Sequence, residues 1–342
     1  MSPSDGVPGR AGRVLDPATA AAEVASVVAD RLDSVERMFR ENLASPLEII
    51  DEIGQFVADG GGKRVRPILH LLSARMCGYR GQDDVILATV LEFIHSATLI
   101  HDDIIDGATT RRGRPAANYR WGNNITVLFG DYLYAKAMSM ALRVGSLTVM
   151  EKLADVTLRM TEGEMLQTRY EGRIDLTEEE YLGLIERKTA ALFGACCELA
   201  AILARVDESH RLALRQSGVQ LGIAFQLVDD LLDFTGDAKV LGKAAATDLR
   251  EGKVTLALID LLGTGSDRAR ELAQRIMDVG KADMPEIGEL TALLEESGAI
   301  ERTRRRAREY ALRATAGLDV FPDGPCRRAL QSVADLLVFR ER

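Results

Sequence analysis

The stretch "DVILATVLEFIHSATLIHDDIID", residues 84–106, decides which kind of fold this chain can adopt. Its apolar residues recur at steps of three and four, as at Leu87, Leu91 and Ile94, which is typical of a buried helix. Gly107 follows directly and suits the end of that helix. Three aspartates gather at this end, where the negative end of the helix dipole disfavours them. The arrangement costs stability unless a cation lies beside it.

The rest of the chain repeats this helical character. No proline occurs between Ala116 and Met284, and proline is excluded from helix interiors, so this region favours long helices with short connections. We therefore predict one all-α domain, residues 18–342, built as a bundle of about 12–13 helices, after a disordered leader over residues 1–17. The predicted helices span roughly 18–42, 46–58, 67–77, 84–106, 123–143, 147–170, 178–204, 208–234, 253–263, 267–279, 286–296, 298–316 and 323–339.

Composition limits the classes of partner. The formal net charge is −9, which disfavours a general binder of nucleic acid or of anionic membranes. No uncharged apolar run reaches the ~18–20 residues of a membrane-spanning helix. The N-terminal residues lack the apolar core of a secretory signal, and the four cysteines form no C-x-x-C pair. We expect a cytoplasmic protein with reduced, buried thiols and no integral membrane segment.

The first acidic cluster has the spacing D-D-x-x-D. Asp102 and Asp106 are four residues apart, so they lie about 40° from each other on one helix face, with Asp103 offset by about 100°. Asp84 can cap the start of the same helix. Carboxylate oxygens are ligands of Mg²⁺, which also favours substrate phosphates. A solvated acidic helix end would look the same at this level.

A second cluster repeats the spacing within "AFQLVDDLLDFTGD", residues 224–237. Asp229, Asp230 and Asp233 again end an apolar helix, and Gln226 lies one turn before Asp230. Two such helices can face each other across a bundle, where metal sites are commonly built. The repeat makes a shared metal-binding cavity the favoured interpretation.

Basic residues surround the two clusters. Lys63, Arg64 and Arg66 in "GGKRVRP" precede a predicted helix whose first residue would be Pro67. The segment is not a P-loop, because no serine or threonine follows the lysine. The other candidate phosphate-binding residues are Arg111, Arg112, Lys188, Lys243 and Lys253. The clustered aspartates require a cation, and the nearby lysines and arginines favour an anion. Together the two sets indicate a diphosphate bound through Mg²⁺.

These motifs together resemble the trans-isoprenyl diphosphate synthases, the polyprenyl synthetase family. The resemblance rests on "GGKRVRP", "HDDIIDGATTRRGRP", "ERKTAALF" and "FQLVDDLLDFTGD", in that order. It implies the isoprenoid synthase fold, a helical bundle around a central substrate cavity, and a homodimer. One departure is the lysine loop "KAAATDL", in which the family commonly has Gly-Ser before the aspartate.

The resemblance also implies residue roles and substrates. Asp102 and Asp106, helped by Asp103, would bind Mg²⁺ on the diphosphate of the allylic substrate, and Asp229, Asp230 and Asp233 would hold a further Mg²⁺ opposite. The allylic diphosphate would contact Arg111, Lys188, Gln226, Lys243 and Lys253. Isopentenyl diphosphate would contact Lys63, Arg66, His95 and Arg112. Thr189 would lie near the reacting carbons, and the residues expected to be catalytic are Asp102, Asp106, Asp229, Lys188 and Thr189.

The first aspartate helix also predicts the product length. One helical turn rises about 5.4 Å, close to one extended five-carbon unit. A chain growing along this helix meets Thr98 and Ala97, then Ile94. Because Ala97 is small, we expect a long-chain product of about eight isoprene units. A short-chain synthase making farnesyl or geranylgeranyl diphosphate is the alternative, since Ile94 could act as a floor.

Other classes of protein fit less well. A terpene cyclase needs no isopentenyl diphosphate site and usually has a different second metal motif. A non-catalytic partner subunit tends to lose aspartates, and all six are present here. A structural Mg²⁺- or Ca²⁺-binding protein would not explain the basic residues.

Overall fold

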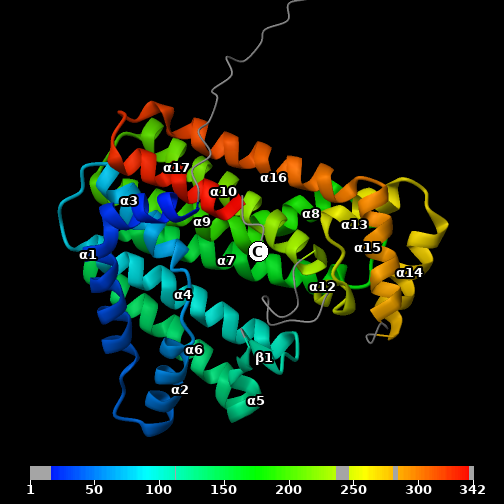
Figure 1. The fold of residues 1–342 in the computed structure, drawn as a ribbon. Coiled ribbons are helices and arrows are strands. Elements are labelled where there is room, and N and C mark those ends of the chain that lie inside the picture. Colours follow the sequence, from blue (N-terminus) through cyan, green and yellow to red (C-terminus); the bar gives the residue numbers. More distant parts are fainter. Residues whose placement is uncertain (1–16, 112, 236–245, 280–283, 339–342) are drawn as a thin grey trace, which may run out of the picture.

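The computed structural model describes residues 17–111, 113–235, 246–279 and 284–338, which are almost entirely helical (Figure 1). The helices are α1 (Pro17–Leu43), α2 (Glu48–Asp59), α3 (Val65–Met76), α4 (Asp83–Ile105), α5 (Ala117–Trp121), α6 (Asn123–Ala141), α7 (Leu147–Tyr170), α8 (Glu178–Ile185), α9 (Ala191–Ala204), α10 (Glu208–Thr235), α12 (Thr247–Arg250), α13 (Leu256–Gly263), α14 (Asp267–Val279), α15 (Met284–Glu296), α16 (Ala299–Ala316) and α17 (Pro325–Val338). Two short 3₁₀ segments are η1 (Leu142–Val144) and η3 (Gly317–Val320), and η2 (Glu186–Ala190) is a π-helical turn. The predicted long helices are thereby confirmed.

The structure differs from the sequence prediction at short elements. The helix predicted over 178–204 is interrupted by η2, which divides it into α8 and α9. A two-stranded hairpin, β1 (Thr110–Arg111) and β2 (Arg114–Pro115), follows α4 where a loop was predicted. The short helices α5 and α12 were also missed. Such elements are too short for apolar periodicity to detect, and their geometry depends on contacts with other parts of the chain. The predicted leader lies outside the described residues except for Pro17, which begins α1.

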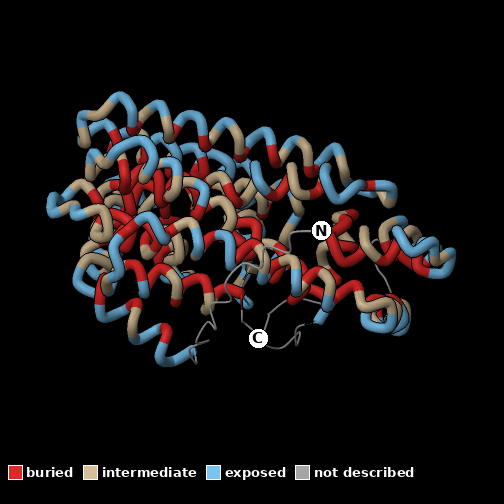
Figure 2. Tube along the Cα trace, turned by 90° about the horizontal axis from the view of Figure 1, so that it is seen from above, coloured by how far each residue is buried: buried red, intermediate tan, exposed pale blue. Residues whose placement is uncertain are grey.

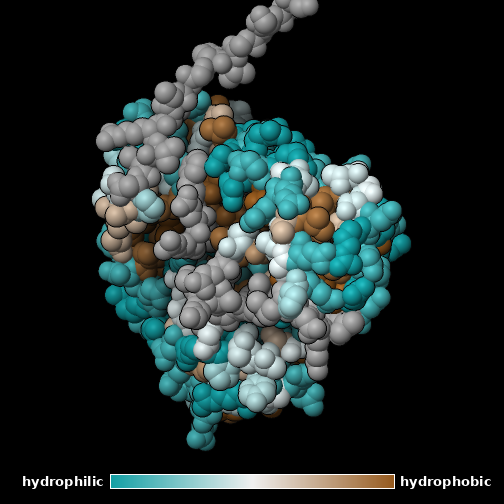
Figure 3. All heavy atoms as spheres, turned by 45° about the vertical axis from the view of Figure 1, so that its right-hand side comes forward, coloured by the Kyte–Doolittle hydropathy of each residue, from teal (hydrophilic) through white to brown (hydrophobic). Residues whose placement is uncertain are grey.

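Helix α10 runs through the middle of the molecule (Figure 1) and packs on α9 and α16. Its first half contributes Leu214 and Leu221 to an apolar cluster shared with α1, α3, α4, α6, α7 and α9. Its second half, from Ile223 to Phe234, belongs to a further cluster with α13, α14, α15 and α16. Figure 2 shows buried residues along the inward sides of the helices and exposed residues outside. The surface facing the viewer in Figure 3 is largely hydrophilic, with smaller apolar areas between. Because α10 contributes residues to both apolar clusters, it joins the two parts of the core.

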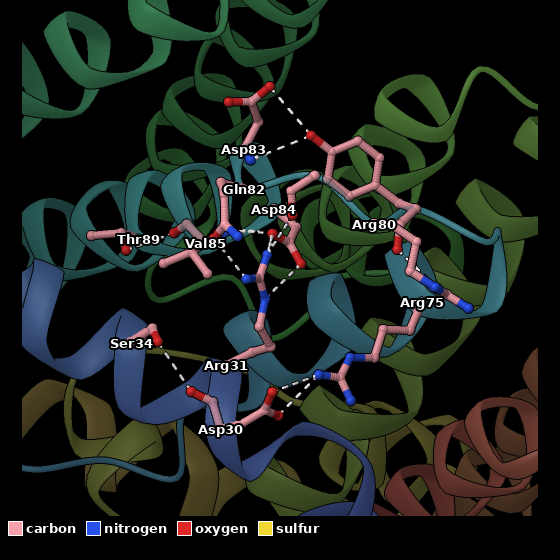
Figure 4. Close-up of polar contacts among 12 residues, drawn as sticks. Asp30, Arg31, Ser34, Arg75, Arg80, Gln82, Asp83, Asp84, Val85 and Thr89 are labelled. Atoms are coloured by element: carbon pink, nitrogen blue, oxygen red, sulfur yellow. Dashed lines mark hydrogen bonds and ion pairs between the residues drawn. The ribbon is translucent and has the colours of Figure 1, made fainter.

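The start of α4 is fixed by an ion pair with α1 (Figure 4). Arg31 pairs with the buried Asp84 and donates from Nη1 to Gln82 Oε1 at 2.8 Å. Asp84 lies inside the helix and accepts the Val85 N–H at 2.9 Å, so the prediction that it caps α4 is wrong. Gly107, with φ at +61°, does occupy the left-handed position after the helix end, as predicted. The axis of α4 is thus held at one end, and its aspartates lie at the other.

Among the described helices, α4 alone has the length and apolar composition to cross a membrane, but 72% of its most apolar window is buried within the fold. Core helices of globular proteins pass the same test. The composition of α4 here reflects its place in the core.

Candidate active site

The C-terminal ends of α4 and α10 open onto one cavity of 1770 Å³. The six aspartates of the two clusters all line this cavity: Asp102, Asp103, Asp106, Asp229, Asp230 and Asp233. The prediction that two distant acidic segments share one cavity is therefore confirmed. Its volume exceeds the ~300–1,000 Å³ of most small-molecule pockets.

The three aspartates of α4 have different environments. Asp103 is 3% exposed, and its Oδ1 accepts the Arg111 Nε–H at 2.7 Å. Asp102 and Asp106 are more accessible and share the cavity face, as the helical spacing predicted. The hairpin of β1 and β2 carries Arg111 to this position, with Gly113 at a φ of +73° in its turn. Asp103 thus anchors the arginine, while Asp102 and Asp106 line the cavity.

The aspartates of the second cluster also differ from one another in burial and in hydrogen-bond partners. Asp230 is 6% exposed, accepts a hydrogen bond from the Tyr181 hydroxyl and accepts another from Gln226 Nε2 at 2.7 Å. Asp233 Oδ2 accepts the Asp248 N–H at 3.0 Å, which ties α10 to the start of α12. Asp229 is the exposed member. The buried pair fixes the helix end, and Asp229 presents its carboxylate to the cavity.

Two lysines lie against the acidic walls. Lys253 Nζ is 3.1 Å from Asp106 Oδ1 and 2.8 Å from Glu251 Oε2, and Lys188 Nζ is 4.0 Å from Asp102 Oδ2. Oxygen donors that attract cations fit a hard divalent ion. Within the described part of the chain, no three acidic, histidine or cysteine side chains converge into a preformed metal site. The donors therefore fit an ion shared with phosphate oxygens better than an ion enclosed by protein alone.

The pKa values of two of these carboxylates also favour a cation at this site. Burial raises the pKa of Asp102 to about 6, and although Lys188 lowers it, the charge of Glu164 adds to the rise. Burial also raises the pKa of Asp230, and the charge of Asp248 adds to it. A cation at these walls would favour the ionised forms, so the site is built to receive positive charge.

The π-helical turn η2 is packed between two glycines. A Cβ on Gly163 of α7 would lie 2.6 Å from the Lys188 nitrogen, and a Cβ on Gly222 of α10 would lie 2.6 Å from the Ala190 Cα. Any larger residue would push against backbone at both places. Turns of this kind recur at functional sites, where they redirect side chains. Here the turn carries Lys188 and Thr189 into the cavity wall.

Side chains on α7 and α10 then orient the residues of the turn. Lys188 Nζ donates to Gln167 Oε1 at 2.9 Å and pairs with Glu164 Oε2 at 2.6 Å. The Thr189 hydroxyl donates to Gln226 Oε1 at 2.8 Å. Sequence reasoning found Lys188, Thr189 and Gln226, but it missed Glu164 and Gln167.

The basic segment before α3 lines the same cavity. Lys63, Arg66 and His95 all contribute to its wall, and the Arg66 guanidinium lies over the Phe193 ring at 5.0 Å. Helix α3 begins at Val65, so the prediction that it begins at Pro67 was wrong by two residues. The described lining of the cavity therefore has an acidic region and a basic region. Two further predicted ligands, Arg112 and Lys243, lie outside the described residues.

Comparison with known proteins shows the family to which this chain belongs. The polyprenyl synthetase family model matches residues 47–294. The chain belongs to the polyprenyl synthetase family. Octaprenyl diphosphate synthase of Escherichia coli (strain K12) is 38% identical over 320 residues, covering 94% of this chain and 99% of that protein. A short chain isoprenyl diphosphate synthase of Methanothermobacter thermautotrophicus is 35% identical over 324 residues, covering 93% and 99%.

Solved structures agree with the fold. A crystal structure of a polyprenyl synthase from Caulobacter crescentus CB15, complexed with calcium and isoprenyl diphosphate, matches with a TM-score of 0.90 at 36% identity. The match covers 98% of this chain and 100% of that chain. The protein is thus a prenyltransferase, a polyprenyl diphosphate synthase with the all-α isoprenoid synthase fold. The predicted family, fold class and enzyme class are confirmed.

The synthase also has an apolar region in its cavity. Ile94 and Ala97 are 1% and 3% exposed, and both line the cavity with Thr98. Across from α4, Ala154 and Leu158 of α7 line it as well. The apolar lining suits a hydrocarbon chain, in contrast to the charged lining around the aspartates.

One buried residue of the synthase had no signal in the sequence. Tyr181, 3% exposed on α8, bonds Asp230 across 49 positions of the chain. Nothing in the spacing of an isolated tyrosine indicates such a partner. Only the packing of α8 on α10 reveals it.

Proposed function

We propose that this synthase uses Mg²⁺ to condense isopentenyl diphosphate head-to-tail with an allylic diphosphate, giving a long-chain trans-polyprenyl diphosphate of about C40. The observation that carries the proposal is the single cavity in which two acidic helix ends, a basic segment and an apolar wall meet. The acidic helix ends match the metal-bound allylic diphosphate, the basic segment matches isopentenyl diphosphate, and the apolar wall matches the growing hydrocarbon chain. Relatives named for long products, such as the octaprenyl synthase, support the chain-length class.

The allylic diphosphate would bind between the acidic walls. Asp102 and Asp106 on one wall, and Asp229 on the other, would hold Mg²⁺ against its oxygens, with Asp103, Asp230 and Asp233 supporting them. The basic residues that would contact this diphosphate directly are Arg111, Lys188, Lys243 and Lys253, with Gln226 as a neutral donor. Bound Mg²⁺ supplies charge neutralisation that makes diphosphate a better leaving group. The accessible positions of Asp102, Asp106 and Asp229 support this division of roles.

Isopentenyl diphosphate would bind at the basic segment. Lys63, Arg66, His95 and Arg112 would hold its phosphates, and guanidinium groups suit such oxygens. The described members of this set line the same cavity as the aspartates. Two diphosphates in one cavity would place their carbon ends close together.

The reaction would proceed by ionisation, attack and proton loss. The allylic carbon–oxygen bond breaks and leaves a carbocation and diphosphate. The isopentenyl double bond attacks the cation, a new carbon–carbon bond forms, and a proton passes to the departed diphosphate. Thr189 and Lys188, held by η2, would lie beside the reacting carbons. The absence of an assigned protein base follows from the use of diphosphate as the base.

Homodimerisation and a cytoplasmic location belong to the same proposal, with residues 18–342 forming the catalytic domain. The surface of α6, η1 and α7 carries large exposed apolar side chains: Leu128, Leu142, Leu147, Leu158 and Met165 are 61% to 74% exposed. A second copy of the chain would cover them, since apolar patches of this kind usually mark interfaces. All four cysteines are free thiols, which supports a reducing compartment, but only Cys196 and Cys197 are buried as predicted, and Cys77 and Cys326 are partly exposed.

Product sizing tests the proposal. Purified protein is incubated with farnesyl diphosphate, labelled isopentenyl diphosphate and either Mg²⁺ or a chelator, and dephosphorylated products are separated by chromatography. We expect Mg²⁺-dependent products of about C40. Products that stop at C15 or C20 would support the short-chain alternative, and no condensation would refute the proposal.

The Ala97→Tyr variant tests the chain-length argument. Its ring would fill the cavity beside Ile94, so we expect shorter products with the first condensation retained. The Ala97→Ser variant, which barely changes volume, is the matched control and should keep the wild-type distribution. An unchanged distribution in Ala97→Tyr would show that this position does not limit growth.

A further inference from the structure

Arg64 is the one basic residue of the segment "GGKRVRP" to which the proposed function gives no ligand. Its backbone lies in the left-handed region, with φ at +46° and ψ at +36°, directly before α3. This conformation is unfavourable for a residue with a Cβ and persists only where the surroundings hold it. Something other than local preference therefore fixes this turn.

The side chain of Arg64 shows what holds it. Its Nη1 is 2.6 Å from Glu92 Oε1, its Nη2 donates to Glu36 Oε2 at 3.1 Å, and its Nε pairs with Glu36 as well. The guanidinium also lies over the Phe39 ring at 4.8 Å. The Arg64 side chain is 10% exposed and that of Glu92 is 8% exposed. Two carboxylates and one ring thus hold this arginine on three sides.

The position of Glu92 connects this ion pair to the site. Glu92 is on α4, three residues before His95, so the two side chains lie on the same helix face. Both line the cavity, as do Lys63, Arg64 and Arg66. The Arg64 guanidinium itself is held by Glu36, Glu92 and Phe39. Arg64 therefore ties the loop that carries two proposed phosphate ligands to the helix that carries a third.

We propose that Arg64, paired with Glu92 and Glu36, is a positioning residue that sets the isopentenyl diphosphate pocket without touching the substrate. The proposal rests on the proposed function, because it concerns the second substrate of that reaction. The pair holds the turn in its unfavourable backbone conformation. In that conformation Lys63, Arg66 and His95 face one ligand together.

The pair should act selectively on one substrate. Removing the Glu92 charge leaves a buried arginine with one carboxylate fewer, and the turn relaxes away from α4. The allylic diphosphate is held by the two aspartate helices and should bind as before. Loss of the pair should therefore raise KM for isopentenyl diphosphate and leave KM for farnesyl diphosphate nearly unchanged.

The test compares Glu92→Gln with Asp84→Asn. Both changes neutralise a buried acid on α4 that pairs with an arginine, but Asp84 lies at the far end of the helix, against Arg31 of α1 (Figure 4). KM for each substrate is measured, and binding of isopentenyl diphosphate alone is followed by calorimetry. We expect about a tenfold or larger weakening for isopentenyl diphosphate in Glu92→Gln only. Thermal midpoints should fall in both variants.

Two further variants keep the test decisive if Glu92→Gln does not fold. Glu36→Gln removes the half-exposed partner and should weaken isopentenyl diphosphate binding in the same selective way. Arg64→Gly makes the left-handed backbone favourable but removes the ion pairs that tie the loop to α4, so it should still bind this substrate weakly. Normal binding in Arg64→Gly would overturn the proposal, because the backbone turn alone would then suffice.

The outcomes also separate this proposal from the proposed function. An active wild-type synthase in which Glu92→Gln and Asp84→Asn behave alike, or in which both substrates weaken equally, would overturn only the positioning role. A wild-type protein that does not condense isopentenyl diphosphate would overturn the proposed function itself.

Discussion

At the scale of single residues, similar side chains in one motif have different tasks. Asp229 is exposed to the cavity, while its neighbour Asp230 is buried and hydrogen-bonded to Tyr181 and Gln226. Asp103 holds Arg111, and Asp102 stays available. Burial separates the residues that shape the site from those to which the proposed function assigns a ligand.

This division predicts the effect of neutralising the two aspartates Asp102 and Asp229, which line the cavity. Asp102→Asn and Asp229→Asn should each lower kcat/KM by at least about 100-fold, because each removes metal-held stabilisation of the leaving group. Thermal midpoints without ligand should hardly fall. Asp323→Asn, an exposed carboxylate near the start of α17, serves as the control and should match the wild type. Turnover near the wild-type value in Asp102→Asn would contradict its role.

A second residue-scale prediction concerns His70, which is fully buried on α3 and contacts the Cys196 carbonyl oxygen through Nδ1 at 2.9 Å. Burial lowers its pKa from 6.5 to about 4. Between these values the unfolded chain binds the proton and the folded protein does not, so stability falls as pH falls. The loss approaches about 3 kcal/mol at pH 4.

The measurement is urea unfolding between pH 7 and pH 4. His70→Asn keeps a donor near the Cys196 oxygen but cannot titrate, so its stability should depend less steeply on pH across this window. Equal pH dependence in the two proteins would show that His70 does not contribute to acid sensitivity.

At the scale of elements, packing against neighbouring helices replaces one turn of a continuous helical sequence with the π-helical turn η2. Gly163 and Gly222 let α7 and α10 approach its backbone, and the turn delivers Lys188 and Thr189 to the cavity. A regular helix over these residues would direct the two side chains differently. The geometry of the site therefore depends on two glycines that pack against the backbone of η2 and do not line the cavity.

The Gly163→Ala variant tests this dependence. Its Cβ would meet the Lys188 backbone at 2.6 Å, so we expect η2 to shift and kcat to fall about 10- to 100-fold. Gly218→Ala is the matched control, since its Cβ would lie 2.5 Å from the Phe193 carbonyl oxygen, within the α9–α10 contact and beyond the last residue of η2. It should lower the thermal midpoint but spare kcat. Equal losses of kcat in both variants would mean that general strain, not the position of η2, is responsible.

At the scale of the whole molecule, large apolar side chains are exposed on α6, η1 and α7. Leu128 and Leu142 are 62% and 63% exposed there, while most large apolar side chains described elsewhere are in the core. Helices α6 and α7 also line the cavity, and Leu158 of α7 belongs to both the cavity wall and this surface. Covering this surface would also support the wall beside the growing chain.

The predicted dimer can be tested by mass. The wild-type protein should elute with a mass near twice the 37.3 kDa of one chain. Leu128→Glu combined with Leu142→Glu should shift it toward the monomer, because charge is costly in an apolar interface. Leu312→Glu on α16, where the leucine is 68% exposed, is the control and should stay dimeric. A monomeric wild type would refute the dimer.

The sequence by itself determined the long helices of this synthase and the acidic and basic residue types that line its cavity. Apolar spacing along residues 84–106 and 208–234 is a local property, and helix geometry follows from it. The same spacing placed Asp102 and Asp106 on one face, as the structure has them. The two D-D-x-x-D clusters with nearby basic residues indicated a diphosphate site before any contact was known.

Only the tertiary structure decided which of these residues meet one another. Tyr181 reaches Asp230, Arg64 turns toward Glu36 and Glu92, and Gly163 receives η2, each across many positions of the chain. Such pairings arise from the packing of helices whose order in space is not encoded by local periodicity. The physical reason is that a helix repeat fixes the direction of a side chain relative to its own axis. Packing energy alone selects the neighbour that lies in that direction.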